Sequence, residues 1–172
     1  MDEQQILSII LQNTFTRASF LKRLAILRGF LEAKFFKKSD LSLQSYLESR
    51  QIIRGDKEAL LTWQNQFIPA LTAQNSYRII NKLTEKLKDL PVITVYIAVL
   101  IPEADIDKIG SWFRTNLGSQ VMLEIYQNAT LVAGCAFVWM GSYHDYSLHN
   151  LIIQKKDQIS ALLDRYASNY QQ

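Results

Sequence analysis

Glycine, proline and cysteine are scarce in this chain of 172 residues, with six, three and one of them respectively. None of the glycines falls into the G-x-G-x-x-G or G-x-x-x-x-G-K-[ST] patterns that cradle phosphates. The single cysteine, Cys135, excludes an intramolecular disulfide. The longest apolar run, residues 131–140, is about half of the roughly 20 residues that a spanning helix needs. We therefore expect no nucleotide, no other cofactor and no spanning helix.

Histidines are also few, and the two present do not form a site. His144 and His149 are five residues apart, so they do not share a helical face, and no cysteine or third histidine completes a metal shell. Asp145 lies beside His144 without a nucleophile or oxyanion-hole motif, and a helix N-cap explains this aspartate. We expect no catalytic, cofactor or metal residues. An enzyme of an unfamiliar type is the third-ranked alternative.

Neither sign of charge is in large excess, because the chain has 19 Lys and Arg and 16 Asp and Glu, which gives a formal charge of +3. The densest basic segment, Arg17 to Lys38, distributes its cations around a helix without an aromatic platform. This pattern favours a solvated helix surface. A basic helical nucleic-acid-binding or other adaptor protein is the runner-up interpretation, supported by a pI near 8.9.

Up to Leu90, apolar residues recur at helical spacing and predict a bundle of five helices. Asn13 or Thr14 is the expected cap of the second helix, which runs to about Phe36, and Ser39 or Ser42 the cap of the third. Arg54-Gly55-Asp56 is expected to form a turn and a cap. The predicted buried positions of the second and fifth helices are Phe20, Leu24, Leu27, Leu31, Phe35, Ile80, Leu83, Leu87 and Leu90.

Pro91 cannot continue the fifth helix, and beyond it the pattern changes. β-Branched and aromatic residues predict three strands, at 92–99, 121–126 and 131–140. A helix is expected over 103–117, ended by Gly118 as a left-handed C-cap. A final helix is expected from Asp145 or Ser147 to about Tyr170. The predicted class is α+β and mostly helical, with a bundle over 1–90 and a β-α-β-β-α segment over 91–172.

The apolar face of the final helix is larger than three short strands can cover. It contains Leu148, Leu151, Ile152, Ile159 and Leu162, spaced nearly as in a coiled-coil seam. We expect part of this face to contact a partner.

The segment 128–141, N-A-T-L-V-A-G-C-A-F-V-W-M-G, followed by Asp145-Tyr146-Ser147, resembles the delta/OSCP family of F-type ATP synthases. That family has a polar turn, Leu-Ile-Gly-Gly, an apolar strand, a glycine turn and then Asp-x-Ser opening the last helix. The matching positions here have structural roles in the family: Leu131, Gly134, Gly141, Asp145 and Ser147. The resemblance covers about Val95 to Leu163.

The resemblance implies a non-catalytic subunit of the peripheral stalk, or stator. Such a subunit links the catalytic alpha/beta head to the b-type stalk, so that the head does not rotate with the rotor. It supports ATP synthesis driven by the proton-motive force without catalysing it. It also implies peripheral attachment at the cytoplasmic side of a bacterial inner membrane, or the equivalent organellar face. The acidic start, Met1 to Gln5, lacks the features of a leader.

Two partners follow from the resemblance, and neither is a nucleic acid or a small molecule. The helical domain would receive amino-terminal helices of the alpha subunit, in a groove beside the first helix. The expected residues of that groove are Ile6, Ile9, Ile10, Ile68 and Leu71. The b-type stalk would contact the final helix through Leu148, Leu151, Ile152, Ile159 and Leu162.

Overall fold

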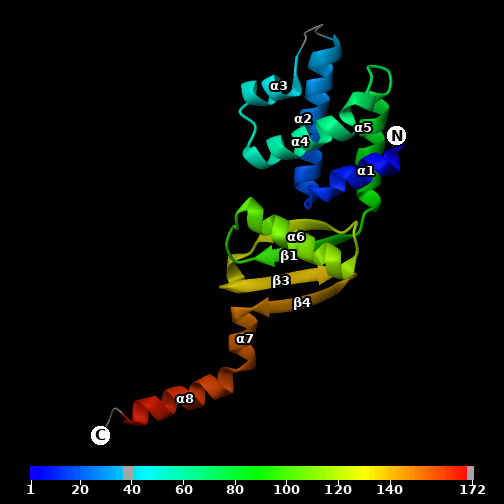
Figure 1. Cartoon of the computed structure of the whole chain (residues 1–172). Coiled ribbons are helices and arrows are strands. Elements are labelled where there is room, and N and C mark those ends of the chain that lie inside the picture. Colours follow the sequence, from blue (N-terminus) through cyan, green and yellow to red (C-terminus); the bar gives the residue numbers. More distant parts are fainter. Residues whose placement is uncertain (37–40, 170–172) are drawn as a thin grey trace. The chain divides into compact units, whose positions relative to one another are not determined.

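The computed structural model describes residues 1–36 and 41–169, and over these residues the fold is α+β and mostly helical, as predicted (Figure 1). The chain divides into two compact units. We call the first the helical unit, which comprises Met1–Val92 and Pro102–Glu124. We call the second the sheet unit, which comprises Ile93–Ile101 and the chain from Ile125 onward. The sequence-based division at Pro91 instead assigned residues 102–124 to the carboxy-terminal segment.

The five helices expected before Pro91 are all present among the described residues. They are α1 (Glu3–Gln12), α2 (Arg17–Phe36), α3 (Leu43–Ser49), α4 (Arg54–Gln66) and α5 (Ser76–Asp89), with a 3-10 turn, η1, at Ile68–Ala70. α6 (Glu103–Leu117) has the bounds that the sequence predicted and belongs to the helical unit.

Side-chain caps explain where the first three helices begin. Asp2 and Gln5 form a capping box at the start of α1, and Ser42 accepts a bond from the Ser45 amide at the start of α3. The cap of α2 is Thr16, whose hydroxyl lies 3.1 Å from the Ser19 amide. The prediction of Asn13 or Thr14 was therefore wrong by at least two residues. Ser39, the alternative cap for α3, lies outside the described residues.

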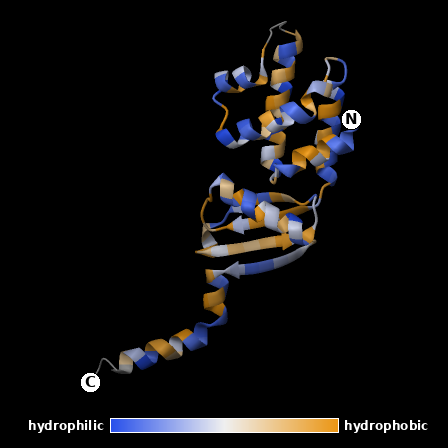
Figure 2. Cartoon of the chain, in the orientation of Figure 1, coloured by the Kyte–Doolittle hydropathy of each residue, from blue (hydrophilic) through white to orange (hydrophobic). Residues whose placement is uncertain are grey.

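The core of the helical unit consists of the predicted apolar stripes. Trp63, Phe67 and Phe20 are the largest of its fully buried side chains. Figure 2 shows hydrophobic residues interleaved with hydrophilic ones along these helices, as expected where one face of each is buried. Phe35 is half-buried, and the other predicted positions of α2 and α5 are buried: Phe20, Leu24, Leu27, Leu31, Ile80, Leu83, Leu87 and Leu90.

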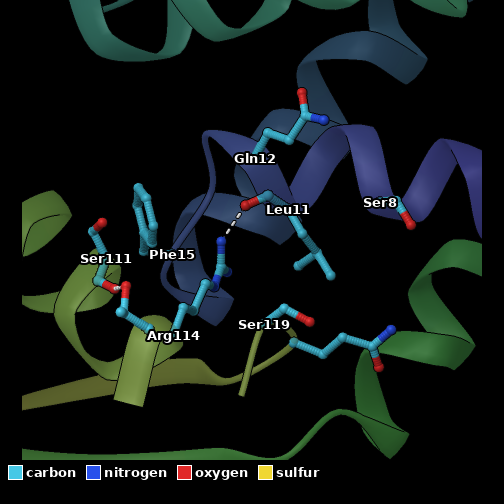
Figure 3. Close-up of a pocket in the computed structure, with 9 residues that line it drawn as sticks. Ser8, Leu11, Gln12, Phe15, Ser111, Arg114 and Ser119 are labelled. Carbon is cyan, nitrogen blue, oxygen red and sulfur yellow. Dashed lines mark hydrogen bonds between the residues drawn. The ribbon is translucent and has the colours of Figure 1, made fainter. Parts of the chain in front are cut away.

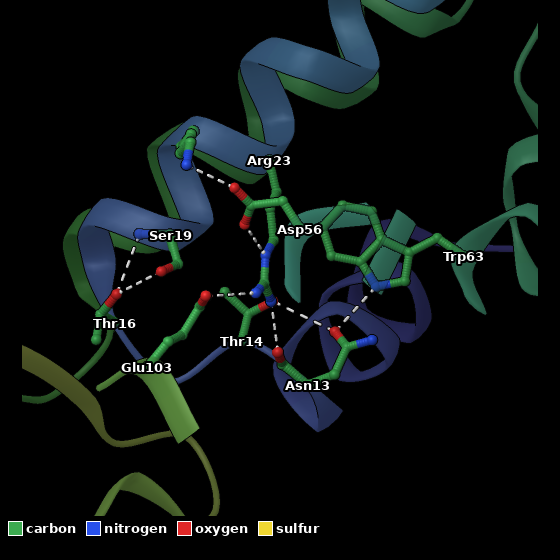
Figure 4. A network of polar contacts seen from close by, with 9 residues as sticks. Asn13, Thr14, Thr16, Ser19, Arg23, Asp56, Trp63 and Glu103 are labelled. Carbon is green, nitrogen blue, oxygen red and sulfur yellow. Dashed lines mark hydrogen bonds and ion pairs between the residues drawn. The ribbon is translucent and has the colours of Figure 1, made fainter. Parts of the chain in front are cut away.

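A polar network inside this core corrects two sequence-based interpretations (Figure 4). Arg23, expected on a solvated surface, is only 3% exposed, and its Nε donates to Asp56 Oδ1 at 2.7 Å. Asp56 is inside the first turn of α4 and not in a turn before a helix. The second carboxylate oxygen lies 2.7 Å from Lys22 Nζ. Arg23 also donates to Thr14 Oγ1 and to Glu103 Oε1.

The sheet has four strands among the described residues, one more than predicted. They are β1 (Val92–Ile97), β2 (Met122–Gln127), β3 (Gly134–Trp139) and β4 (Ser142–Ser147), in the order β2-β1-β3-β4. β3 pairs antiparallel with β1 and with β4, with Val95 opposite Phe137 and Phe137 opposite His144. The missed strand, β4, lies at the edge of the sheet and is polar and mostly exposed, so it has no apolar pattern to reveal it.

Three further boundaries differ from the sequence-based expectation. The apolar run 131–140 begins in a 3-10 turn, η2 (Ala129–Leu131), and becomes a strand only at Gly134. Gly118 ends α6 with φ 145° and ψ 143°, which is not the left-handed helical conformation. The expected final helix is two helices, α7 (Leu148–Gln154) and α8 (Lys156–Asn169). Its predicted end, Tyr170, lies outside the described residues.

Candidate functional site

The largest group of exposed apolar side chains in the sheet unit lies on α7 and α8, where they alternate with hydrophilic residues (Figure 2). All five predicted stalk-contact residues are exposed, from 38% for Leu148 and Ile159 to 53% for Leu162. At about 100° per residue, Leu148, Leu151 and Ile152 lie on one face of α7. Ile159 and Leu162 lie on one face of α8, together with Leu163 and Tyr166. We call the apolar faces of these two helices together the α7–α8 stripe, and define it as Leu148, Leu151, Ile152, Ile159, Leu162, Leu163 and Tyr166. Exposed apolar faces of this kind are typical of interaction surfaces.

The joint between β4 and α7 determines where the stripe begins. Ser147 is buried, and its hydroxyl accepts a hydrogen bond from the Asn150 amide at 3.1 Å, which caps α7. Asp145 Oδ1 accepts from the Ser147 amide at 2.8 Å. The Asn150 side chain donates back to the Asp145 carbonyl at 3.1 Å. The expected cap role at this position thus belongs to Ser147, with Asp145 supporting it.

Gly134 and Gly141 have left-handed backbone conformations, with φ of 80° and 78°. A Cβ at Gly134 would lie 2.4 Å from the Tyr146 carbonyl oxygen, so a side chain there would displace β4. A Cβ at Gly141 would have nothing within 4 Å. Leu131 is buried in a small cluster with Ala98 and Ala136. The residues on which the resemblance depends therefore shape the turn and the strand pair that lead into α7.

A hollow of about 510 Å³ adjoins the first turn of α7. Gly134, Ser147, Leu148, Asn150 and Leu151 are among the residues that line it, together with Asp145. Hydrogen bonds from Ser147 lower the pKa of the Asp145 carboxyl below its ordinary value. The carboxylate is therefore ionised at neutral pH, and it places a negative charge beside the apolar start of the stripe.

The residues predicted to bind the alpha subunit are not on a surface groove. Ile6, Ile10, Ile68 and Leu71 are at most 5% exposed and belong to the core of the helical unit. Ile9 is half-buried against the same core. The wide apolar arc of α1 is covered because α1 contacts both α4 and α5. Four of these side chains belong to the core of the bundle and the fifth packs against it, so the sequence-based assignment of a groove to them was wrong.

A different hollow, of about 430 Å³, does lie beside α1 (Figure 3). Ser8, Gln12 and Phe15 line one wall, and Arg114 and Ser119 line the other. The guanidinium of Arg114 donates to the carbonyls of Leu11, Thr14 and Val121.

Arg114 acts within this hollow as a cap for α1. It satisfies carbonyls at and just beyond the last turn of α1, which the helix itself leaves without partners. Its guanidinium also lies 4.5 Å from the centre of the Phe15 ring. Desolvation lowers the pKa of Arg114 to about 10, so it remains charged at neutral pH. This role could not be predicted because Arg114 is about a hundred residues from the carbonyls that it caps.

The basic segment of α2 is largely occupied by contacts within the chain. Arg17 pairs with Glu124 at 2.9 Å, Lys22 with Asp56, and Arg28 with Glu32. Lys37 and Lys38 lie outside the described residues. Because the described cations of α2 face several directions and carboxylates neutralise these three, they do not form the basic stripe that nucleic-acid binding favours.

Neither histidine is placed for metal chemistry. His144 stacks on Phe137 with ring centres 4.9 Å apart, and residues 1–36 and 41–169 contain no group of three His, Cys, Asp or Glu that could hold a metal ion. In the same part of the chain, no helix is both long enough and apolar enough to cross a bilayer. No protein-family model matches this chain, and no curated protein matches it either.

Proposed function

We propose that this chain is a stator subunit of a rotary F-type ATP synthase, similar to the delta/OSCP family, which joins the catalytic head to a b-type stalk. The observation that carries the proposal is the exposed α7–α8 stripe, which follows directly on the residues that resemble the family signature. A stator subunit must hold two larger bodies together and needs no catalytic residue of its own. The proposal therefore assigns no chemical step, cofactor or small-molecule substrate to this chain.

The stalk contact is proposed for the stripe itself. Seven exposed apolar side chains at helical spacing are the anchors that a helix-in-groove or helix-on-helix contact uses. Burying one Leu or Ile side chain contributes about 1.5 to 3 kcal/mol, so a few of them suffice for a stable complex. The hollow beside α7 extends this surface to the edge of the sheet.

The head contact is proposed for the helical unit, with amino-terminal helices of the alpha subunit as its partner. The assignment is to the unit and not to particular residues, because Ile6, Ile10, Ile68 and Leu71 are buried. With both contacts made, the chain would be a peripheral protein on the cytoplasmic face of a bacterial inner membrane, or on the equivalent organellar face. Its association with the membrane would be through the complex.

The experiment that tests this proposal is affinity purification of the tagged full-length chain from its source cells under mild conditions, followed by mass spectrometry. We expect the alpha and beta subunits of the head and the b-type stalk subunit to be enriched together. A control in which Leu162 is changed to Asp should retain the head subunits and lose the stalk subunit, because Leu162 is half-exposed on the stripe. Recovery of neither synthase component by the unmodified chain would overturn the proposal.

A further inference from the structure

The carboxylate of Asp145, at the end of β4, has no cationic partner. Glu3 and Glu32, by contrast, each form an ion pair at 2.9 Å with a Lys or Arg of the helical unit. The two oxygens of Asp145 accept hydrogen bonds from uncharged groups, the Ser147 amide at 2.8 Å and the Tyr143 hydroxyl at 3.5 Å. Among residues 1–36 and 41–169, no Lys or Arg forms an ion pair with this carboxylate.

The nearby cations of the sheet unit do not neutralise this charge. His149 attracts the carboxylate, but an imidazole is mostly neutral at pH 7. Lys155 and Lys156 follow α7, and neither takes part in an ion pair within the described part of the chain. A negative charge therefore stays uncompensated beside the start of α7.

This charge lies at the wall of the hollow of about 510 Å³ beside α7. Pockets of about 300 to 1,000 Å³ hold small organic ligands, so the hollow has room for a long side chain. Leu148 and Leu151 form an apolar part of its lining, and Asn150 and Gln154 contribute side-chain amides. A Lys or Arg side chain suits such a lining, because its methylene groups pack on apolar surface while its charged end meets a carboxylate.

The uncompensated carboxylate limits what can cover the hollow. A carboxylate removed from water without a cation beside it is costly, so an apolar or acidic occupant is disfavoured. The anionic surface of a membrane would be repelled by the same charge. A helix that packs on the exposed Leu148 and Leu151 would reach the hollow as well, because these two residues belong both to the stripe and to its lining.

We infer that the hollow beside α7 receives a Lys or Arg side chain of the stalk helix, which pairs with Asp145. This inference rests on the proposed stator function and specifies its partner: an amphipathic helix with one basic side chain at the edge of its apolar face. Leu148 and Leu151 supply part of the area of contact. Asp145 selects the alignment in which the basic side chain enters the hollow.

The test measures binding of the full-length chain to the soluble part of the b-type stalk subunit from the same organism by isothermal titration calorimetry. Asp145→Asn removes the charge but keeps an oxygen that accepts from the Ser147 amide, and it should weaken binding about tenfold. The matched control is Asp157→Asn, which removes the same charge from the side of α8 opposite Ile159 and Leu162. The control should weaken binding less than about twofold. Circular dichroism should show equal helix content in the two variants and the unmodified chain.

A second arm identifies the basic residue and separates charge pairing from a purely structural role of Asp145. Each Lys and Arg of the stalk helix is changed to Gln and tested against the unmodified chain and against Asp145→Asn. One such change should weaken binding about tenfold in the first case and less than about threefold in the second, because both substitutions remove the same pair. The effect of Asp145→Asn should also shrink as NaCl is raised from about 0.05 M to about 0.5 M.

The outcomes separate this inference from the stator proposal. Equal effects of Asp145→Asn and Asp157→Asn, or additive effects of every stalk change, would overturn the inference and leave the stator proposal standing. Failure of the unmodified chain to bind the stalk would overturn both. Self-association in sedimentation that Asp145→Asn abolishes would overturn the inference by giving the hollow another occupant, a second copy of this chain.

Discussion

At the scale of single residues, Gly134 and Gly141 separate two reasons why a position requires glycine. One is the close approach of a neighbouring backbone, and the other is a left-handed backbone conformation. Gly134 and Gly141 have nearly equal positive φ, but only at Gly134 would a Cβ collide with a neighbouring carbonyl. Gly141→Ala should therefore cost about 1 kcal/mol, which is the effect of the left-handed conformation alone. Gly134→Ala should cost about 3 kcal/mol or more, because β4 must also move.

Urea unfolding of the two variants, with the unmodified chain beside them, measures this difference. If the two substitutions destabilise the protein equally, the approach of β3 to β4 at Tyr146 is wider than the structure describes. If neither has an effect, the left-handed conformation at these positions is wrong.

The Arg23–Asp56 pair gives a second prediction at this scale. Both side chains are at most 3% exposed, so removing Asp56 leaves the buried guanidinium with only the half-exposed Glu103, 3.3 Å away, as an ionic partner. Asp56→Ala should destabilise the protein by about 3 to 5 kcal/mol. The matched control is Glu58→Ala, which breaks the exposed Arg54–Glu58 pair of the same helix and should change stability by less than about 0.5 kcal/mol. Thermal unfolding at fixed ionic strength reports both values, and equal values would contradict the burial of this pair.

Residues differ in how far the sequence alone could predict them. Leu24, Leu27 and Leu83 were predicted to be buried because burial follows from their spacing within one helix. The contacts of Arg23, Asp56 and Arg114 were not predicted, because their partners lie between about nine and one hundred residues away in the chain. Spacing within a helix carries no information about such pairs. The same reason explains why α1 was predicted to need a partner, although α4 and α5 cover most of its apolar arc.

At the scale of elements, α8 should be dispensable for folding and required for stalk binding. Its side chains from Lys156 to Ala167 are all exposed, so its removal uncovers no core. A chain that ends after Lys155 should unfold within about 2 °C of the full-length protein, since surface changes alter stability little. The same chain should lose at least tenfold in affinity for the stalk subunit.

Calorimetric binding, together with a thermal scan of both lengths, tests this prediction. A large fall in melting temperature would mean that α8 packs on the rest of the protein. Undiminished stalk binding by the shortened chain would exclude the α8 residues of the stripe from the interface.

Elements whose apolar residues recur at a regular spacing were predicted well, and elements without such a spacing were missed. α6 was predicted to the residue because its apolar positions recur at helical spacing and a glycine follows it. β4, with the sequence S-Y-H-D-Y-S, has no apolar alternation and is a strand because its backbone pairs with β3. The division between α7 and α8 was also not predictable, because Lys155 is a good helix former and no proline or glycine marks the place.

At the scale of the whole molecule, the class of fold followed from the change of period at Pro91, but the grouping of elements did not. α6 and the first residues of β2 group with the bundle because three residues of α6 contact it. Arg114 contacts α1, Gly110 contacts the turn after α1, and Glu103 contacts α2. Two of these contacts depend on long polar side chains whose partners the sequence does not reveal. For the candidate site, the sequence predicted the exposed apolar residues of the last helices, and it assigned a surface groove to residues that are buried.

The central claim is that this one chain joins the head to the stalk. It is tested most directly by mixing the purified chain with the alpha/beta head and with the soluble b-type stalk subunit from its source organism, and measuring the masses of the complexes by native mass spectrometry. The account predicts a ternary complex that forms only when the chain is present, and a binary complex with the head alone when the chain ends after Lys155. A stalk that binds the head equally well without the chain, or a chain that binds neither component, would contradict it.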